Sequence, residues 1–369
     1  MNKATLELNR AGQSLWLDNI TRELLTSGTL KRYIEEFSVT GLTSNPTIFD
    51  QAMKHGAAYD ADLRMLASRN RPAEELFFEI ALQDLGRAAD LFRPVHDRTG
   101  GLDGWVSLEV SPHLARDARS SLTQAQELHA RANRPNLFIK IPGTKEGLPA
   151  IEEAIFSGVP VNVTLLFSPE QYVAAANAWL RGIERRIEAD LSPDVASVAS
   201  LFLSRWDVAT CGRVPAALAN RLGLAIGRSA YQAYCGLLTS SRWLRAMNAG
   251  ARPQRLLFAS TGTKDPKASD VLYVEGLIAP LTINTMPENT LKAFAEHGRV
   301  GRQIEPTGGD SEAVLAQFGK AGVDLGALAA KLQEDGATAF VKSWDDLMQG
   351  IAAKVTALQQ SAARAANAL

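Results

Sequence analysis

The chain has 369 residues, of which 46% are hydrophobic, so it can bury a substantial core as one large domain or two ordinary ones. Its 39 lysines and arginines nearly balance 40 aspartates and glutamates, which gives a net charge of -1. With this balance the protein has no strong overall positive field to attract nucleic acid or an anionic membrane, and we expect neither as a partner.

The two cysteines, Cys211 and Cys235, are too few for a disulfide framework and form no CxxC pair. The reducing cytoplasm is therefore the expected location. The first thirty residues lack an apolar signal core, and no later run approaches the roughly 20 apolar residues that span a bilayer. The five histidines show no spacing typical of a metal site.

Short apolar runs alternate with longer segments of helical period along most of the chain. The runs are 14–19, 38–46, 104–112, 136–143, 159–168, 196–205, 255–260 and 279–287. The helical patterns between them include 72–92, 114–132, 149–156, 169–189 and a long one at 215–247. Strands that alternate with helices predict parallel pairing and right-handed crossovers. Eight such units predict an α/β fold of the closed (β/α)8 TIM barrel type, with a doubly wound sheet as the alternative.

Beyond about Val300 the pattern predicts additional C-terminal helices, including 313–322 and an alanine-rich tail at 352–369. No Pro/Ser-rich linker marks a second domain. We therefore expect a single barrel domain over 1–369, with about 300–369 as appended helices. The tail is expected to dock on the barrel, and a lid over the barrel mouth is the alternative.

A lysine inside one apolar run is the most informative chemical feature. In the predicted strand, Lys140 shares a face with Phe138, whereas Leu137, Ile139 and Ile141 occupy the other face. An ammonium without a partner is costly to bury, and desolvation favours the neutral amine. A neutral amine can attack a carbonyl group and form a Schiff base. The alternative is a lysine at the end of an edge strand that extends its charge into water.

Polar residues alternate with apolar ones in several other predicted strands, and in a barrel alternate residues point into the lumen. The predicted inward polar set comprises Asp18, Glu109, Asn162, Thr164, Thr282 and Asn284, together with Lys140. Such an interior is a poor hydrophobic core, because each buried polar group needs a partner. It is typical of an active site, although half-exposed sheets with wetted polar faces would show the same alternation.

Five motifs in chain order resemble the transaldolase family, in its longer bacterial type, over about 14–290. They are TSNPTIF at 43–49, VSLEVSP at 106–112, FIKIPGTKEG at 138–147, VPVNVTLLFS at 159–168 and FASTGTKDP at 258–266. The resemblance implies a (β/α)8 barrel with the Schiff-base lysine on strand four, where the strand count places Lys140. It also implies an enzyme that needs no metal or organic cofactor.

By position, the resemblance implies roles for five further residues. Asp18 is similar to the family's general acid/base, and Glu109 and Thr164 are similar to the pair that holds a catalytic water. Asn45 and Asn162 are similar to ligands of substrate or intermediate. The alternation within strands supports the inward direction of Asp18, Glu109, Asn162 and Thr164 independently, but it does not bear on Asn45.

The resemblance also implies a phosphate site after strands six and seven. It indicates Ser200 and Arg205 after strand six, and Ser260 and Lys264 after strand seven. Arginine suits bidentate phosphate binding, whereas lysine acts as a point charge. In shorter relatives an arginine lies near the second position. For Arg205 and Lys264, the alternative is an ordinary solvent-exposed charge without a role in phosphate binding.

The implied activity is that of a pentose phosphate pathway enzyme with sugar-phosphate substrates. A dihydroxyacetone unit would pass from sedoheptulose 7-phosphate or fructose 6-phosphate to glyceraldehyde 3-phosphate or erythrose 4-phosphate. Two alternatives stay open, namely a Schiff-base aldolase that releases free dihydroxyacetone and a non-catalytic phosphosugar-binding barrel. We expect a monomer or homodimer.

Overall fold

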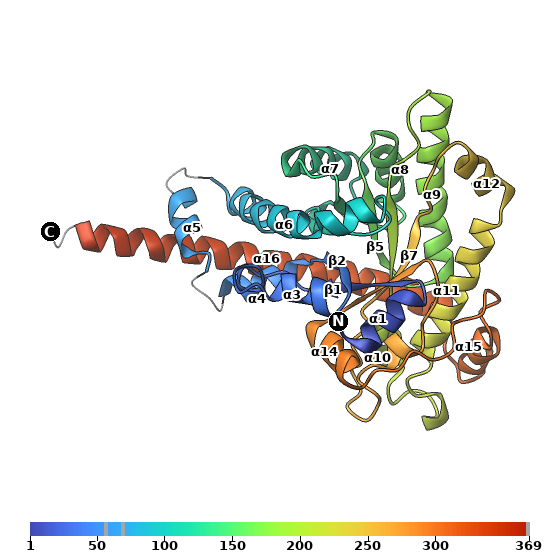
Figure 1. The fold of residues 1–369 in the computed structure, drawn as a ribbon. Coiled ribbons are helices and arrows are strands. Elements are labelled where there is room, and N and C mark those ends of the chain that lie inside the picture. The colour runs from blue at the N-terminus through green and yellow to red at the C-terminus, as the bar shows by residue number, and fades with distance from the viewer. Residues whose placement is uncertain (55–57, 68–70, 367–369) are drawn as a thin grey trace.

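The computed structural model describes residues 1–54, 58–67 and 71–366. Within these residues, eight short parallel strands form one sheet surrounded by helices (Figure 1). The strands are β1 (Gln13–Asp18), β2 (Val39–Thr43), β3 (Val106–Glu109), β4 (Leu137–Pro142), β5 (Val161–Leu166), β6 (Ser197–Phe202), β7 (Arg255–Ala259) and β8 (Thr282–Met286). Seven of them lie inside a predicted run, and β1 begins one residue before its run.

The strand order shows that the sheet closes on itself. The order is β2-β1-β8-β7-β6-β5-β4-β3, so the first strand pairs with both the second and the last. The two ends of this series, β2 and β3, meet at a parallel bridge between Gly41 and Trp105. The backbone N–H of Leu42 donates to the Trp105 carbonyl at 2.9 Å across the same seam. This closure confirms the (β/α)8 barrel and excludes the doubly wound sheet, whose strand order reverses.

Helices cover the outside of the barrel. They are α1 (Lys3–Arg10), α2 (Arg22–Thr26), α3 (Thr29–Glu36), α4 (Pro46–Lys54), α5 (Asp60–Ala67), α6 (Ala73–Arg98), η1 (Pro112–Leu114), α7 (Ala118–Ala132), α8 (Leu148–Phe156), α9 (Pro169–Glu188), α10 (Ser204–Thr210), α13 (Leu272–Glu275) and α14 (Glu288–His297). None of the helices in the described ranges is both long and apolar enough to cross a membrane.

Capping residues explain where several of these helices begin. At α9, the side chain of Ser168 accepts a hydrogen bond from the backbone N–H of Gln171, and Pro169 occupies the first helical turn. At α7, Asp117 accepts in the same way from Ser120. A polar cap satisfies a backbone donor that has no partner inside the helix, and proline fits the first turn because no donor is needed there.

The prediction of one long helix over 215–247 was wrong. The segment divides into η2 (Ala216–Leu218), α11 (Leu222–Leu238) and α12 (Ser241–Asn248). The break between the last two coincides with Ser240, whose side chain caps the new helix by accepting from the backbone N–H of Trp243. Apolar periodicity continues through this cap, and so it could not reveal the break.

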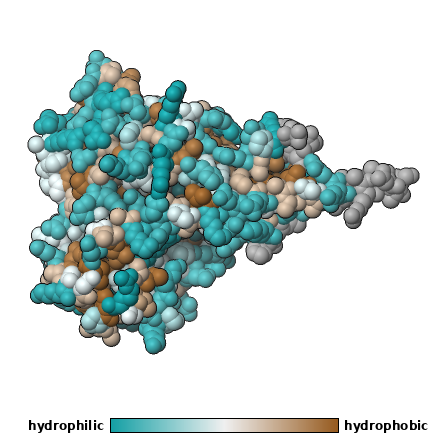
Figure 2. All heavy atoms as spheres, turned by 180° about the vertical axis from the view of Figure 1, so that it is seen from behind, coloured by the Kyte–Doolittle hydropathy of each residue, from teal (hydrophilic) through white to brown (hydrophobic). Residues whose placement is uncertain are grey.

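The predicted C-terminal helices are present as α15 (Ser311–Lys320) and α16 (Leu325–Ala366). The alanine-rich tail is not an element of its own, because it continues the 42-residue α16. This helix runs past α4, α5 and α6 and extends well beyond the rest of the molecule (Figure 1). The same projection is seen from behind in Figure 2.

The barrel lumen is filled in layers, and aromatic rings form its lower part. The rings of Trp105 and Phe138 are stacked with centroids 4.1 Å apart, and Trp16 lies 6.3 Å from Phe138. Gly41 must lack a side chain, because a Cβ there would approach Trp16 to within 2.5 Å. Polar residues of the same strands lie above these rings and are described with the site below.

A buried ionic cluster closes the opposite, N-terminal end of the barrel. The Arg255 guanidinium donates to the carbonyls of Leu102 and Thr282 at 3.0 and 2.8 Å and lies 3.9 Å from Asp103. Asp103 accepts hydrogen bonds from Ser14 and, at 2.7 Å, from the Trp16 indole. The cluster ties residues from different parts of the barrel wall to one another.

The predicted inward direction of Thr282 and Asn284 on the last strand was wrong. Thr285, rather than its neighbours, faces the lumen and contacts Thr43 at 2.8 Å. The Asn284 side chain instead donates to the carbonyl of Tyr273 in α13, outside the sheet. Paired residues of parallel strands share a face, and Trp16 pairs with Thr285. The register with β1, which cannot be read from alternation alone, sets the direction.

Candidate active site

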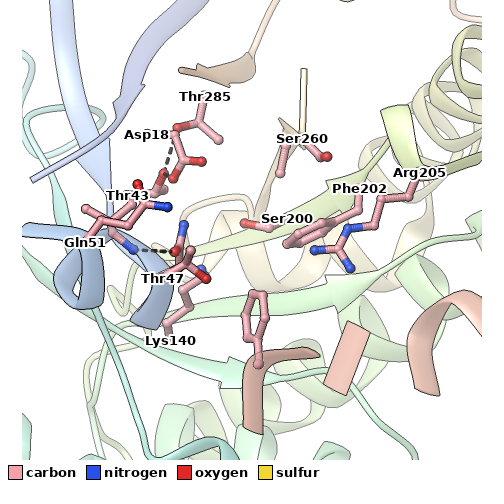
Figure 3. Close-up of a pocket in the computed structure, with 14 residues that line it drawn as sticks. Asp18, Thr43, Thr47, Gln51, Lys140, Ser200, Phe202, Arg205, Ser260 and Thr285 are labelled. Atoms are coloured by element: carbon pink, nitrogen blue, oxygen red, sulfur yellow. Dashed lines mark hydrogen bonds between the residues drawn. The ribbon is translucent and has the colours of Figure 1, made fainter. Parts of the chain in front are cut away.

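The C-terminal ends of the strands surround a cavity of about 240 Å³. Its lining comes from β1, β2, β4, β6, β7, β8 and the C-terminal helix, and comprises Asp18, Thr43, Asn45, Thr47, Ile48, Gln51, Lys140, Ser200, Phe202, Arg205, Ala259, Ser260, Thr285 and Phe340. Figure 3 shows Asp18 and Thr43 on one side of this cavity, with Ser260 and Arg205 opposite. Six predicted site residues therefore lie around one space at the end where barrels of this type carry chemistry.

Lys140 lies at this cavity with only 4% of its surface exposed. Its Nζ donates to Glu109 Oε2 at 3.2 Å and to the backbone carbonyl of Ser44 at 3.1 Å. The alternative of a lysine extending into water is therefore wrong. The inward face of β3 supplies the partner carboxylate, because Glu109 pairs with Lys140 in the sheet.

Asp18 lies across the same cavity and is held by a short chain of hydroxyl groups. Thr43 Oγ1 donates to Asp18 Oδ1 at 2.8 Å and also contacts Thr285. Burial raises the pKa of Asp18, although the charge of Lys140 and the hydrogen bond from Thr43 oppose this shift. A carboxyl group with a raised pKa changes its protonation state more readily at physiological pH, as a general acid/base requires.

Glu109 and Thr164 each bury one oxygen atom that has no hydrogen-bond partner among the described residues. These atoms are Glu109 Oε1 and Thr164 Oγ1, and both residues are almost fully buried. Burial raises the pKa of Glu109, and the charge of Lys140 partly offsets the effect. Buried polar atoms without a protein partner commonly hold water, and so the two atoms fit the predicted catalytic water.

A β-bulge in β5 lies immediately beside Thr164. The register with β6 shifts between Val163 and Leu166, and Leu165 adopts a left-handed backbone with φ of 60°. A bulge bends its strand and re-aims neighbouring side chains, and bulges of this kind are common beside active sites. Simple alternation predicted the inward direction of Thr164, but it could not predict the bulge that follows.

Asn162 lies deeper in the lumen and does not line the cavity. Its Nδ2 donates to Ser107 at 3.1 Å, and its Oδ1 accepts from Ser200 Oγ at 2.7 Å. It therefore links β3 to β6 beneath Lys140. Asn45 lines the cavity itself and accepts from the backbone N–H of Ile48, which fixes the start of α4 beside the site.

Arg205 and Ser260 form a polar edge of the cavity after β6 and β7. Burial lowers the pKa of Arg205, and no described residue makes a hydrogen bond or ion pair with its guanidinium. Ser260 has a left-handed backbone with φ of 55°, and its hydroxyl lies 2.8 Å from that of Ser204. A half-buried cation without a protein anion is suited to bind an anionic ligand such as a phosphate.

Lys264 is the one predicted site residue near the cavity edge that faces a different space. It is exposed and lines a second cavity of about 650 Å³, beyond α10. Its charge is only a minor influence against the burial that raises the pKa of Asp18. The structure therefore does not place Lys264 among the residues that line the cavity of Asp18 and Lys140.

Several lining residues were missed by the sequence reasoning. They are Thr43, Thr47, Ile48, Gln51, Phe202, Ala259, Thr285 and Phe340. Thr43 and Phe202 share the inward alternation of their strands, so the same parity argument could have found them. Nothing in the local sequence indicates Phe340, because its approach depends on where α16 docks.

Comparison with known proteins identifies the family of this site. The family model for transaldolase/fructose-6-phosphate aldolase matches residues 15–351. The chain belongs to this family. It is 44% identical to a transaldolase of Parafrankia sp. (strain EAN1pec), over 95% of this chain and 98% of the relative. It is 44% identical to a transaldolase of Thermobifida fusca (strain YX), over 97% of this chain and the full length of the relative.

A more divergent relative, transaldolase 2 of Nostoc sp. (strain PCC 7120 / SAG 25.82 / UTEX 2576), is 37% identical over 96% of this chain. The family and the enzyme class that the five motifs predict are therefore confirmed. The chain is an enzyme of the transaldolase type. Of the two alternatives, the non-catalytic phosphosugar-binding barrel no longer fits. The Schiff-base aldolase stays open, because the matching family includes fructose-6-phosphate aldolase.

Proposed function

We propose that the chain is a transaldolase of the pentose phosphate pathway that works through a Schiff base on Lys140. The donor would be sedoheptulose 7-phosphate or fructose 6-phosphate, and the acceptor glyceraldehyde 3-phosphate or erythrose 4-phosphate. The carrying observation is the cavity on which Lys140, Asp18 and Arg205 converge, with the buried carboxylate of Glu109 lying 3.2 Å from the Lys140 amine. It combines a nucleophile, groups that exchange protons and a cation for a phosphate.

Attack on the carbonyl requires that the Lys140 amine lose a proton. Glu109 Oε2 lies 3.2 Å from Nζ and has a raised pKa, so it is placed to accept that proton. A neutral pair also avoids two buried charges. A water held between Glu109 Oε1 and Thr164 Oγ1 would then carry protons as the carbinolamine loses its hydroxyl and becomes the iminium.

Cleavage requires a base for the C4 hydroxyl of the bound sugar. Asp18 lies at the same cavity as Lys140 and is oriented by Thr43. When Asp18 takes the hydroxyl proton, the C3–C4 bond breaks and its electrons move into the iminium. An aldose phosphate leaves, and a three-carbon enamine stays on Lys140. The acceptor aldehyde then reverses these steps.

Arg205 would bind the phosphate group with Ser260, Ser200 and Lys264 as further ligands. Its guanidinium lines the cavity on the side away from Asp18 (Figure 3). This places the phosphate and the reacting carbons at opposite ends of one extended substrate. Asn45 and Asn162 would bind hydroxyl groups of the substrate or of the covalent intermediate.

Borohydride trapping tests the nucleophile, the substrate class and the chemistry together. The enzyme is incubated with fructose 6-phosphate and borohydride, and its intact mass and peptide map are recorded. We expect one sugar-derived adduct on the peptide that carries Lys140. Lys140→Met should remove the adduct and lower kcat by at least about 10³-fold.

Lys145 gives a matched control for this experiment. It lies in the same motif but is exposed, so Lys145→Met should keep both the adduct and the activity. An unmodified wild-type chain, or an adduct mapped to another lysine, would refute Lys140 as the nucleophile.

A second candidate function is the release of free dihydroxyacetone, because the matching family model includes fructose-6-phosphate aldolase. The two activities share the lysine and differ in the fate of the enamine. Fructose 6-phosphate is supplied with and without erythrose 4-phosphate, and the products are quantified. Transfer predicts that little cleavage occurs without the acceptor, whereas comparable cleavage in both cases favours the aldolase.

Two wider expectations go with this proposal. Cys211 and Cys235 are free in the described structure, which suits a protein of the reducing cytoplasm. The enzyme would act as a monomer or homodimer.

A further inference from the structure

Helix α16 is fastened across the open end of the barrel on both sides of Phe340. Before Phe340, Gln333 Nε2 donates to the carbonyls of Gly143 and Leu165 at 3.1 and 2.9 Å. The further contacts are an ion pair of Glu334 with Arg116, a 2.7 Å contact of Asp345 with the His113 ring, and a hydrogen bond between Thr47 and Ser343. These partners lie after β2, β3 and β4 and at the end of β5, so four parts of the barrel mouth hold the helix.

This fastening places Phe340 directly at the nucleophile. The ring centroid lies 5.7 Å from Lys140 Nζ, and the side chain is only 7% exposed. Phe340 also meets Phe202 edge-on, with centroids 6.4 Å apart. With Ile48 and Ala259, the two rings form the apolar part of a lining that is otherwise rich in hydroxyl, amide and charged groups.

The position matters because the enamine is bonded to Nζ, so groups that surround Nζ also border the enamine. A phenyl ring cannot donate to or accept from water through a conventional hydrogen bond, and it fills space that water would otherwise take. Closing a site with apolar groups is a recognised way to protect a reactive intermediate from hydrolysis. The polar groups that move protons lie on the other sides of Lys140.

We propose that Phe340 determines whether the enamine is transferred or released, by keeping bulk water away from it. The inference rests on the proposed transaldolase function and goes beyond it. In release, a proton from water adds to the enamine carbon, water then adds to C2 of the iminium, and dihydroxyacetone leaves as the Lys140 amine is regenerated. In transfer, the same carbon bonds to the acceptor's aldehyde carbon, whose oxygen takes the proton held by Asp18. The water held by Glu109 and Thr164 then adds to C2 of the product iminium, so the new ketose phosphate leaves and the Lys140 amine is regenerated.

The test measures a ratio in the full-length enzyme. With fructose 6-phosphate and erythrose 4-phosphate, the rate of dihydroxyacetone release is divided by the rate of sedoheptulose 7-phosphate formation. Phe340→Ala should raise this ratio by at least about tenfold, which equals a change of about 1.4 kcal/mol in the relative barriers. Phe340→Val should raise it less and keeps the test available if the alanine variant does not fold. Phe340→Leu, which keeps apolar bulk, should leave the ratio near the wild-type value.

Leu347→Ala is the control for general loosening of α16. Leu347 is buried in the same helix but does not line the cavity, so its ratio should stay unchanged. An equal rise in Leu347→Ala, or no rise in Phe340→Ala and Phe340→Val, overturns the role of Phe340. Two wild-type measurements separate these results from failure of the proposed function. Absence of a borohydride adduct at Lys140 would refute the Schiff base, and a wild-type ratio that already favours release would indicate the aldolase.

Discussion

The hydroxyl of Thr164 is a buried polar group without a protein partner, and such a group costs folding free energy. An unsatisfied buried donor or acceptor is worth about 1–3 kcal/mol of lost stability. Thr144 offers a contrast, because its hydroxyl donates to the Ala115 carbonyl at 2.6 Å and accepts from the backbone N–H of Gly147. The fold retains the costly hydroxyl next to Lys140 and Glu109, which points to a role in the reaction rather than in stability.

Thr164→Val should therefore lower kcat and leave the free energy of unfolding equal or higher. Loss of one proton-transfer group commonly costs about 10²–10⁴-fold in rate. Thr144→Val is the matched control and should show the opposite pattern, with lower stability and nearly normal kcat. Steady-state kinetics and urea denaturation of both variants check the prediction. If Thr164→Val keeps full activity, the water-holding role is wrong.

At the residue scale, the polar side chains that point into the lumen could be predicted where the alternation within a single strand determines their direction. Asp18, Glu109 and Lys140 follow this pattern, and their neighbours in the sheet agree in register. Asn284 did not, because its direction depends on which residue of β1 lies beside it. Phe340 could not be predicted at all, since its approach to Lys140 is a tertiary contact between distant segments.

At the scale of elements, α16 approaches the barrel closely at one glycine. A Cβ on Gly336 would lie 3.2 Å from the side chain of Leu165 and 3.3 Å from that of Phe167. The helix therefore contacts the β5 bulge through a position without a side chain. Because this bulge directly follows Thr164, we expect a displacement of α16 to disturb the geometry of the site.

Gly336→Leu should displace α16 from the bulge, destabilise the protein by about 1–3 kcal/mol and raise KM for the sugar phosphates. Gly336→Ala should be nearly neutral, because its higher helix propensity, worth about 1 kcal/mol, offsets the tight contact. Gly350→Leu is the control within the same helix, where a Cβ meets no atom closer than 3.7 Å. Thermal unfolding and steady-state kinetics measure these effects. A normal KM in Gly336→Leu would contradict the link between helix and site.

Most elements were predictable because their signals are local. A strand of this barrel is a short apolar run between polar turns, and each of the eight runs overlaps one. The division of 215–247 into three helices depends on single caps such as Ser240, which interrupt hydrogen bonding without interrupting the apolar pattern. The sequence predicted additional C-terminal helices but not a single helix of 42 residues. The path of α16 across the barrel depends on tertiary contacts, which local patterns do not reveal.

At the scale of the whole molecule, stability and chemistry lie at opposite ends of the barrel. The Arg255–Asp103 cluster closes the N-terminal end, and the Lys140 cavity opens at the other. We propose that the barrel and the appended helices form one domain. Trp344 of α16 is buried against Phe77 of α6, with ring centroids 5.0 Å apart, so the two parts share a hydrophobic core.

Arg255→Met should lower the free energy of unfolding by about 3–5 kcal/mol, because it leaves the buried Asp103 without its cation. KM and kcat should stay near normal under conditions where the variant is folded. Arg252→Met is the control, since Arg252 pairs with Asp194 at the surface and exposed pairs contribute about 1 kcal/mol or less. Urea denaturation and kinetics at one temperature test the contrast. A large fall in kcat for folded Arg255→Met would show that the two ends are coupled.

The placement of Phe340 on α16 has a consequence for biosynthesis. The ribosome makes the eight strands, the last of which ends at Met286, before it makes the helix that covers their mouth. If Phe340 excludes water as proposed, a nascent chain without α16 would hold Lys140, Glu109 and Asp18 in an open, wet barrel and would release what it cleaves. Transfer would begin only when the final helix has been synthesised and has docked.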